Sequence, residues 1–195
     1  MKKTLATLAL ILTATTASAM DSWDTTNPTA TLMSPNPTPS AAIFTGGRGI
    51  LVDYIKEKGN RLADKGDIWS YRVSIFPQDS YICTDQSNQI SVYYKIDDQK
   101  VGKLKGWVPA SKDFFQLTAA NLYANEEDLA EQPHYTTYYD SLFKKDKVTF
   151  HMNAFIEALK NGKELTIQTY DSCGESITFT VPLNGANTAI NKLVK

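Results

Sequence analysis

KELTIQTYDSCGESITFTV, residues 163–181, contains two segments in which apolar and polar residues alternate. Alternation with a period of two is typical of a strand that buries one face. Leu165 and Ile167 lie on the inward face of the first segment. The inward positions of the second segment are Ile177, Phe179 and Val181. Because residues 171–174, Asp-Ser-Cys-Gly, are turn formers, the stretch predicts a β-hairpin.

A helix is predicted on each side of this hairpin. The helix before it has apolar residues at i, i+3, i+4 and i+7 and is closed by Asn161-Gly162. These apolar residues are Met152, Phe155, Ile156 and Leu159. The helix after the hairpin follows Asn184-Gly185, and its inward residues are Ala189, Ile190 and Leu193. The unit from Val148 to Val194 is therefore interpreted as a core and not as an active site.

The middle of the chain predicts further strands. Tyr71, Val73 and Ile75 alternate with polar residues until Pro77, and residues 81–84 are expected to form a second, short strand. The clearest alternation runs from Ile90 to Ile96, and residues 101–108 are expected to pair with it. The predicted fold class is α+β: a β-rich antiparallel sheet or sandwich with a few short helices and one disulfide.

Two further segments are predicted to be helical. Residues 43–49 resemble a phosphate-binding loop but lack its Gly-Lys-Ser/Thr ending, so they are interpreted as a turn that opens a helix. The apolar face of that helix would consist of Ile50, Leu51, Tyr54 and Ile55. The second helix is expected over residues 111–122, with Ser111 as its N-cap.

The chain begins with the features of an export signal. Lys2 and Lys3 precede a short apolar run, and Ala17-Ser18-Ala19 is a small-x-small cleavage site. The apolar run is shorter than the roughly 20 residues that span a membrane. We therefore expect a signal peptide at 1–19, cleaved after Ala19, a periplasmic location, and no transmembrane segment in the mature chain.

Residues 20–40 are rich in Pro, Thr, Asn and Ser, which predicts a disordered linker, and a single β-rich domain is expected over 41–195. A docking peptide anchored by Trp23, Leu32 and Met33 is the alternative for the linker. The chain has 20 Lys and Arg residues against 21 Asp and Glu residues. Without a basic excess, we expect no nucleic-acid partner.

The two cysteines, Cys83 and Cys173, are predicted to form a disulfide. An even number of cysteines in an exported protein favours a bridge, and two cysteines allow one pairing. Neither cysteine has the Cys-x-x-Cys spacing or the basic neighbours of a reactive thiol.

No pattern predicts a metal, a cofactor or a catalytic group. His134 and His151 are the only histidines, His134 in a loop and His151 in a capping or packing position at the start of a helix. They lack further ligands at zinc spacing. The carboxylates Glu126, Glu127, Asp128 and Glu131 lack the calcium-loop pattern and are expected to face solvent.

The tyrosine-rich segment from His134 to Phe143 is the candidate partner surface. It contains Tyr135, Tyr138, Tyr139 and Phe143 and has charged stretches on both sides. Tyrosine combines large contact area with a polar tip, which suits interfaces. The same residues are equally compatible with core packing, and both readings remain open at this point. The spacing of the tyrosines fits a helix better than a strand.

The C-terminal motifs resemble two groups of small exported proteins of Gram-negative bacteria. The motifs are Phe155-x-x-x-Leu159, Gly162-Lys163-x-Leu165 and Phe179-x-Val181-Pro182-Leu183-x-Gly185, together with Phe150, Ala189 and Leu193. The groups are the invasion-associated locus B family and the periplasmic accessory proteins of type VI secretion systems. The Tyr81-Ile82-Cys83 segment also resembles the second group. Resemblance to this second group implies a β-rich, non-enzymatic protein linked to the envelope-spanning machine or the cell wall around it.

We therefore expect a non-catalytic periplasmic accessory or binding protein, associated with type VI secretion, whose partner is an envelope protein or a cell-wall component. The alternative is an inhibitor of an envelope-targeting enzyme such as a lysozyme. An enzyme that acts on peptidoglycan is the third possibility.

Overall fold

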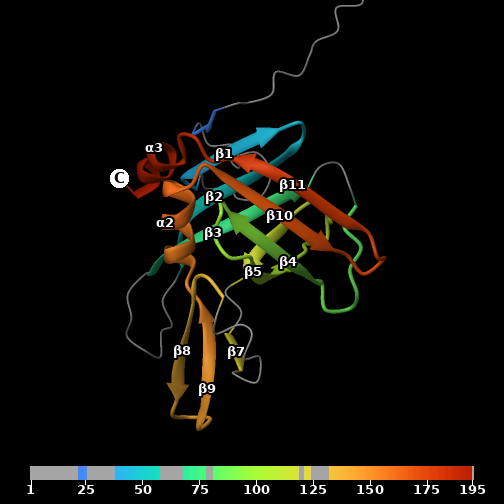
Figure 1. Cartoon of the computed structure of the whole chain (residues 1–195), viewed down its shortest axis with the longest axis vertical. Helices are drawn as coiled ribbons and strands as arrows, with labels where there is room; N and C mark the ends of the chain where they lie inside the picture. Colours follow the sequence, from blue (N-terminus) through green and yellow to red (C-terminus); the bar gives the residue numbers. More distant parts are fainter. Residues whose placement is uncertain are drawn as a thin grey trace, which may run out of the picture.

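The larger of the two sheets that the described residues form is antiparallel and has eight strands (Figure 1). The structure is a computed structural model that describes residues 22–25, 38–57, 68–77, 81–118, 121–123 and 132–194. The strand order is β1-β2-β3-β6-β5-β4-β10-β11. The strands are β1 Ser40–Thr45, β2 Arg48–Glu57, β3 Ile68–Pro77, β4 Gln89–Ile96, β5 Gly102–Trp107, β6 Phe115–Thr118, β10 Glu164–Tyr170 and β11 Ser176–Pro182.

The sheet curls so that its last strand returns to its first two. β11 contacts β1 and β2, and in Figure 1 β11 lies beside β1. The helices α2 (Met152–Asn161) and α3 (Ala186–Asn191) pack against each other, and α2 also contacts β3. A 3-10 helix, Lys192–Val194, follows α3. The β-rich α+β fold class with one disulfide is confirmed.

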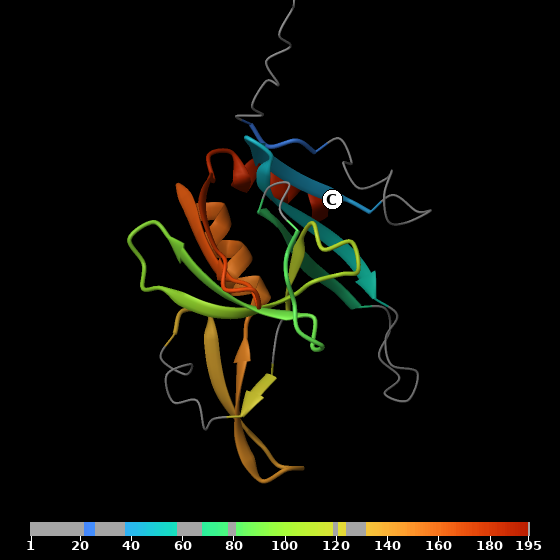
Figure 2. The ribbon, with the colours of Figure 1, turned by 90° about the vertical axis from the view of Figure 1, so that its right-hand side faces the viewer.

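A second, smaller sheet stands apart from the first. Its order is β7-β9-β8, with β7 at Asn121–Tyr123, β8 at Tyr135–Asp140 and β9 at Lys145–Phe150. β8 and β9 form a hairpin that projects away from the main sheet in both Figure 1 and Figure 2. Strand β9 leads directly into α2, so the hairpin and the main core share a connection.

The closing unit folds as its periodicity predicts. Leu165, Ile167, Phe179 and Val181 are buried, and β10 pairs with β11 as a hairpin. Ile177, also predicted to point inward, is half-buried. The predicted inward residues of both helices are also buried, apart from the half-buried Met152. They are Phe155, Ile156, Leu159, Ala189, Ile190 and Leu193. The predicted strands at β3 and β4, and the return of β5 beside β4, are confirmed.

The helix predicted after Gly49 is wrong, because residues 48–57 form strand β2. Gly46 and Gly47 form the turn, and their φ values of 57° and 80° belong to the mirror-image turn that joins two antiparallel strands. Leu51 and Val52 are both buried, although successive residues of a strand point to opposite faces. Because β2 is covered on both faces in this region, it lacks the alternation by which a strand is recognised.

The helix predicted over residues 111–122 and the strand predicted over 81–84 are also wrong. Residues 115–118 form β6, which fills the gap between β3 and β5 and buries Phe115 and Leu117. Residues 81–85 belong to no strand, since the Cys83 N–H bonds to the side chain of Asp171 and not to a neighbouring strand.

Several sequence predictions concern residues outside the described ranges. This holds for the signal peptide at 1–19, for most of the linker at 20–40 including Leu32 and Met33, and for the acidic run at 126–131. Within the linker, residues 22–25 lie against the domain. Asp24 forms a backbone bridge with Ala42, and Trp23 packs against the protein's own core. These four residues are therefore part of the folded unit.

Candidate binding surface

The base of the β8–β9 hairpin is anchored in the core by an aromatic cluster. Tyr135 is only 8% exposed, and its ring lies edge-on to Phe150 with a centroid distance of 5.3 Å. Its hydroxyl donates a hydrogen bond to the Lys103 carbonyl on β5. Tyr135 was predicted as part of a partner surface, but its burial places it in the anchor. Of the two interpretations left open for the tyrosine-rich segment, core packing is therefore the correct one for Tyr135.

His134 and Tyr94 hold the start of the hairpin. The Tyr94 hydroxyl lies 2.9 Å from both the Pro133 carbonyl oxygen and His134 Nδ1. The two rings stack at 5.9 Å, and Phe155 of α2 lies edge-on to both. Burial raises the pKa of Tyr94 and lowers the pKa of His134, because both charged forms would lose solvation. Both groups are thus held neutral near pH 7.

The distal half of the hairpin exposes large side chains. Tyr138 is 44% exposed, Tyr139 62% and Phe143 54%. The sequence interpretation did not single out Leu142, which is 82% exposed at the turn. Together, Tyr138, Tyr139, Leu142 and Phe143 are called the hairpin tip below. Tyr138 and Tyr139 are successive residues of β8 and therefore lie on opposite faces of the hairpin. Large exposed side chains on a projecting element make it a candidate binding element.

Asp140 orders the turn that carries Leu142 and Phe143. Its carboxylate accepts the N–H groups of Leu142 at 3.0 Å and Phe143 at 3.3 Å. It also forms an ion pair with Lys147, whose Nζ lies 4.6 Å from the Phe143 ring centroid. The hydrogen bond from Lys147 is the main reason why the pKa of Asp140 lies below its ordinary value. The tip is thus preorganised, which reduces the entropy lost on binding.

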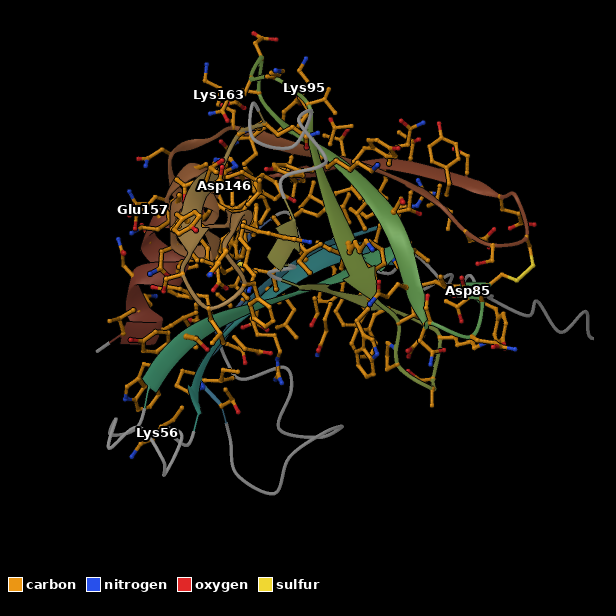
Figure 3. The ribbon with its side chains drawn as sticks, turned by 90° about the horizontal axis from the view of Figure 1, so that it is seen from below. Lys56, Asp85, Lys95, Asp146, Glu157 and Lys163 are labelled. Atoms are coloured by element: carbon orange, nitrogen blue, oxygen red, sulfur yellow. A yellow bond between two sulfur atoms is a disulfide. The ribbon has the colours of Figure 1, made fainter. Side chains whose placement is uncertain are left out.

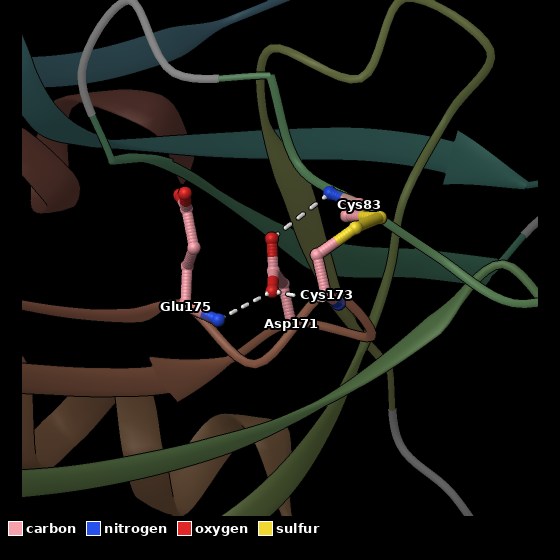
Figure 4. The surroundings of a disulfide bond; sticks show 4 residues. All are labelled: Cys83, Asp171, Cys173 and Glu175. Carbon is pink, nitrogen blue, oxygen red and sulfur yellow. Dashed lines mark hydrogen bonds between the residues drawn. A yellow bond between two sulfur atoms is a disulfide. The ribbon is translucent and has the colours of Figure 1, made fainter.

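The predicted disulfide between Cys83 and Cys173 is confirmed, with a Cα–Cα distance of 5.7 Å. Asp171 supports it by accepting N–H groups from Cys83 at 3.2 Å, Cys173 at 3.0 Å and Glu175 at 2.9 Å (Figure 4). From below, the disulfide lies beside Asp85, on the opposite side of the molecule from Asp146 of the hairpin (Figure 3). It therefore stabilises the β10–β11 turn and does not shape the tip.

The described residues contain no group of three or more His, Cys, Asp or Glu side chains that could hold a metal ion. His151 precedes α2 but does not cap it with its side chain, which instead contacts the Thr136 hydroxyl. Of the two roles predicted for His151, capping or packing, side-chain capping is therefore wrong, although His151 occupies the N-cap position of α2. In the part of the chain that the structure describes, no helix has the length and apolar character needed to cross a membrane.

No protein-family model matches this chain. No curated protein matches it at a significant level either. Among solved structures, invasion associated protein B from Bartonella henselae aligns with 80% of this chain and 91% of its own length. The identity is 12% and the TM-score is 0.35.

Proposed function

We propose that this protein is a non-catalytic accessory protein of the bacterial cell envelope that binds its partner through the hairpin tip. The observation that carries the proposal is the group of four exposed large side chains at the end of the β8–β9 hairpin, two on strand β8 and two on the turn that Asp140 orders. A projecting element with aromatic anchors and a rigid turn matches the general properties of energetically important interface residues.

The compartment is proposed from the disulfide together with the N-terminal sequence. Disulfides persist in oxidising compartments, of which the bacterial periplasm is one. The Lys2-Lys3 start, the short apolar run and the Ala17-Ser18-Ala19 site favour export with cleavage after Ala19. An envelope protein or a cell-wall component is the partner class that such a location makes available. Type VI secretion as the setting rests on the resemblance of the C-terminal motifs alone.

The proposal is tested by cross-linking in living cells. A photoreactive amino acid at Leu142 should give a discrete cross-linked product, because this side chain is the most exposed of the tip. The same amino acid at Thr178 is the matched control, since Thr178 is also exposed but lies on β11 of the main sheet. Equal amounts of cross-linked product from both positions would show that the hairpin tip is not the binding surface. Loss of the product in cells without type VI secretion genes would support that setting.

An inhibitor of an envelope-targeting enzyme is the second candidate. The ordered turn from Asp140 to Lys144 projects from the domain and suits insertion into an enzyme's cleft. Inhibition of a lysozyme by the purified protein, and its loss on Leu142→Asp, would support this candidate. Unchanged lysozyme activity in the presence of excess protein would exclude it for that enzyme.

A further inference from the structure

Strand β8 is the last strand of the small sheet in the described part of the chain. The order of the small sheet is β7-β9-β8, so β8 pairs with β9 on one side. On its other side, no strand among the described residues pairs with it. An edge strand presents a row of backbone N–H and C=O groups that another strand can satisfy.

The register identifies which backbone groups point to that edge. The His151 N–H donates to the His134 carbonyl at 2.7 Å, so the pair formed by residues 134 and 151 is hydrogen-bonded. Hydrogen-bonded and non-hydrogen-bonded pairs alternate along an antiparallel ladder. Thr136 and Tyr138 therefore direct their backbone groups toward β9. Thr137 and Tyr139 direct theirs away from β9.

The edge also lacks the features that normally prevent pairing. From Tyr135 to Tyr139 the strand contains no charged residue and no proline, and its register with β9 continues without a bulge. Edge strands that stay unpaired usually carry one of these features. Thr and Tyr are moreover residues that favour strands. The sequence of β8 therefore favours the addition of another strand.

We propose that β8 pairs antiparallel with β8 of a second copy of this chain to form a two-fold dimer. In this arrangement Thr137 lies opposite Tyr139 of the partner subunit, and the two-fold axis passes beside Tyr138. The pairing joins two three-stranded sheets into one continuous sheet. Each residue on one side of the axis has its equivalent on the other, as a closed two-fold interface requires.

A second copy is the occupant that fits this edge because the edge is its own complement. The two outward positions are two residues apart, so an antiparallel copy satisfies both of them in one register. The paired segment is uncharged, and the two copies do not repel each other there. Tyr138 meets Tyr138 of the partner subunit in a non-hydrogen-bonded pair, where side chains approach most closely. The distal hairpin projects away from the main sheet (Figure 2).

Dimerisation also enlarges the hairpin tip surface. Tyr138 pairs across the strands with Lys147, and Lys147 lies over the Phe143 ring, which places Tyr138 and Phe143 on the same face. The dimer brings the same face of both copies together, so the partner subunit contributes its own Tyr138 to one shared aromatic surface. The proposal does not depend on the proposed function, because it concerns the backbone of β8.

Cysteine trapping tests the register. Both natural cysteines are in the disulfide, so Tyr138→Cys introduces the only free thiol. Across the axis the two Cα atoms would be about 4.5 Å apart, within the range for a disulfide. Mild oxidation should give a covalent dimer on a non-reducing gel. Residue 136 lies on the same face of the same strand, but in the dimer the two copies of this residue are too far apart to form a disulfide. Thr136→Cys should therefore run as a monomer on the same gel. Equal trapping by both variants, or none by Tyr138→Cys, would overturn the register.

Sedimentation over a range of concentrations tests the backbone contact. Thr137→Pro removes an outward N–H without breaking a bond to β9, and it should weaken dimerisation by about tenfold or more. Thr137→Ala keeps that N–H and should dimerise like the unmodified chain. A wild-type chain that is monomeric at its highest soluble concentration would overturn the proposal. So would equal dimerisation of Thr137→Pro and Thr137→Ala.

Discussion

Removal of the Cys83–Cys173 bridge should lower the free energy of unfolding, because the unfolded chain gains conformational entropy. The bridge closes a loop with a sequence separation of 90 residues. The chain entropy of such a loop corresponds to about 4–5 kcal/mol at 25 °C, as an upper value. For a domain of this size that corresponds to a fall in melting temperature of roughly 10–15 °C. The hydrogen bonds of Asp171 to Cys83 and Cys173 remain possible without the bridge, so the folded state should keep its local geometry.

The assay is thermal unfolding of the Cys83→Ser/Cys173→Ser double variant, with the unmodified protein in oxidised and reduced form. The reduced protein should melt close to the double variant, because both lack the same constraint. Asp171→Asn serves as a control for the local hydrogen bonds and should lower stability in the oxidised and reduced forms alike. A double variant that melts within about 2 °C of the oxidised protein would refute the entropic argument.

Three further predictions concern the core. Asp53→Ala removes the buried carboxylate that pairs with Arg72 at 2.8 Å. Because the Arg72 side chain is 36% exposed and keeps part of its solvation, the free energy of unfolding, measured by urea denaturation, should fall by about 1–3 kcal/mol. Burial lowers the pKa of His134, so the unfolded chain binds more protons than the folded protein as pH decreases below 6.5. The free energy of unfolding should therefore fall over this range. In a pH series on His134→Gln, this decrease should be absent. Gly102→Ala would place a Cβ 2.2 Å from the Tyr94 ring and should lower stability by about 1–3 kcal/mol in the same urea assay.

The sequence predicts secondary structure best where one face of a strand or helix is buried and the other is exposed to solvent. β4 has the burial alternation of such a strand, and its period is visible in the residues themselves. α2 buries Phe155, Ile156 and Leu159 along one face for the same reason. In these elements the local pattern and the tertiary environment agree, so no long-range information is needed.

The sequence predictions are wrong for β2 and β6, which an alternation of buried and exposed residues does not identify. β2 is buried on both faces near Leu51, which removes the alternation and leaves a spacing that also fits a helix. β6 is a four-residue strand that depends on its neighbours β3 and β5, because Phe115 and Leu117 are buried only within that sheet. A strand of this kind is decided by pairing partners distant in the sequence.

The candidate surface could be located but not resolved residue by residue. The tyrosine-rich composition indicates the segment, yet Tyr135 is buried and Leu142 is the most exposed apolar side chain in it. The difference arises because β8 begins in the core and ends at a projecting turn. The Leu142-Phe143 pair between Asp140 and the following lysines is the signal that could have identified the tip.

The central claim, that the hairpin tip is a binding surface, is tested most directly by comparing affinity with stability in tyrosine variants. Tyr138→Ala and Tyr139→Ala should weaken binding to the envelope partner by about 1–2 kcal/mol or more while their melting temperatures stay close to that of the unmodified protein. Tyr135→Ala, the control for the buried anchor, should lower the melting temperature by several degrees. Variants of Tyr138 and Tyr139 that melt several degrees lower and still bind would contradict the account.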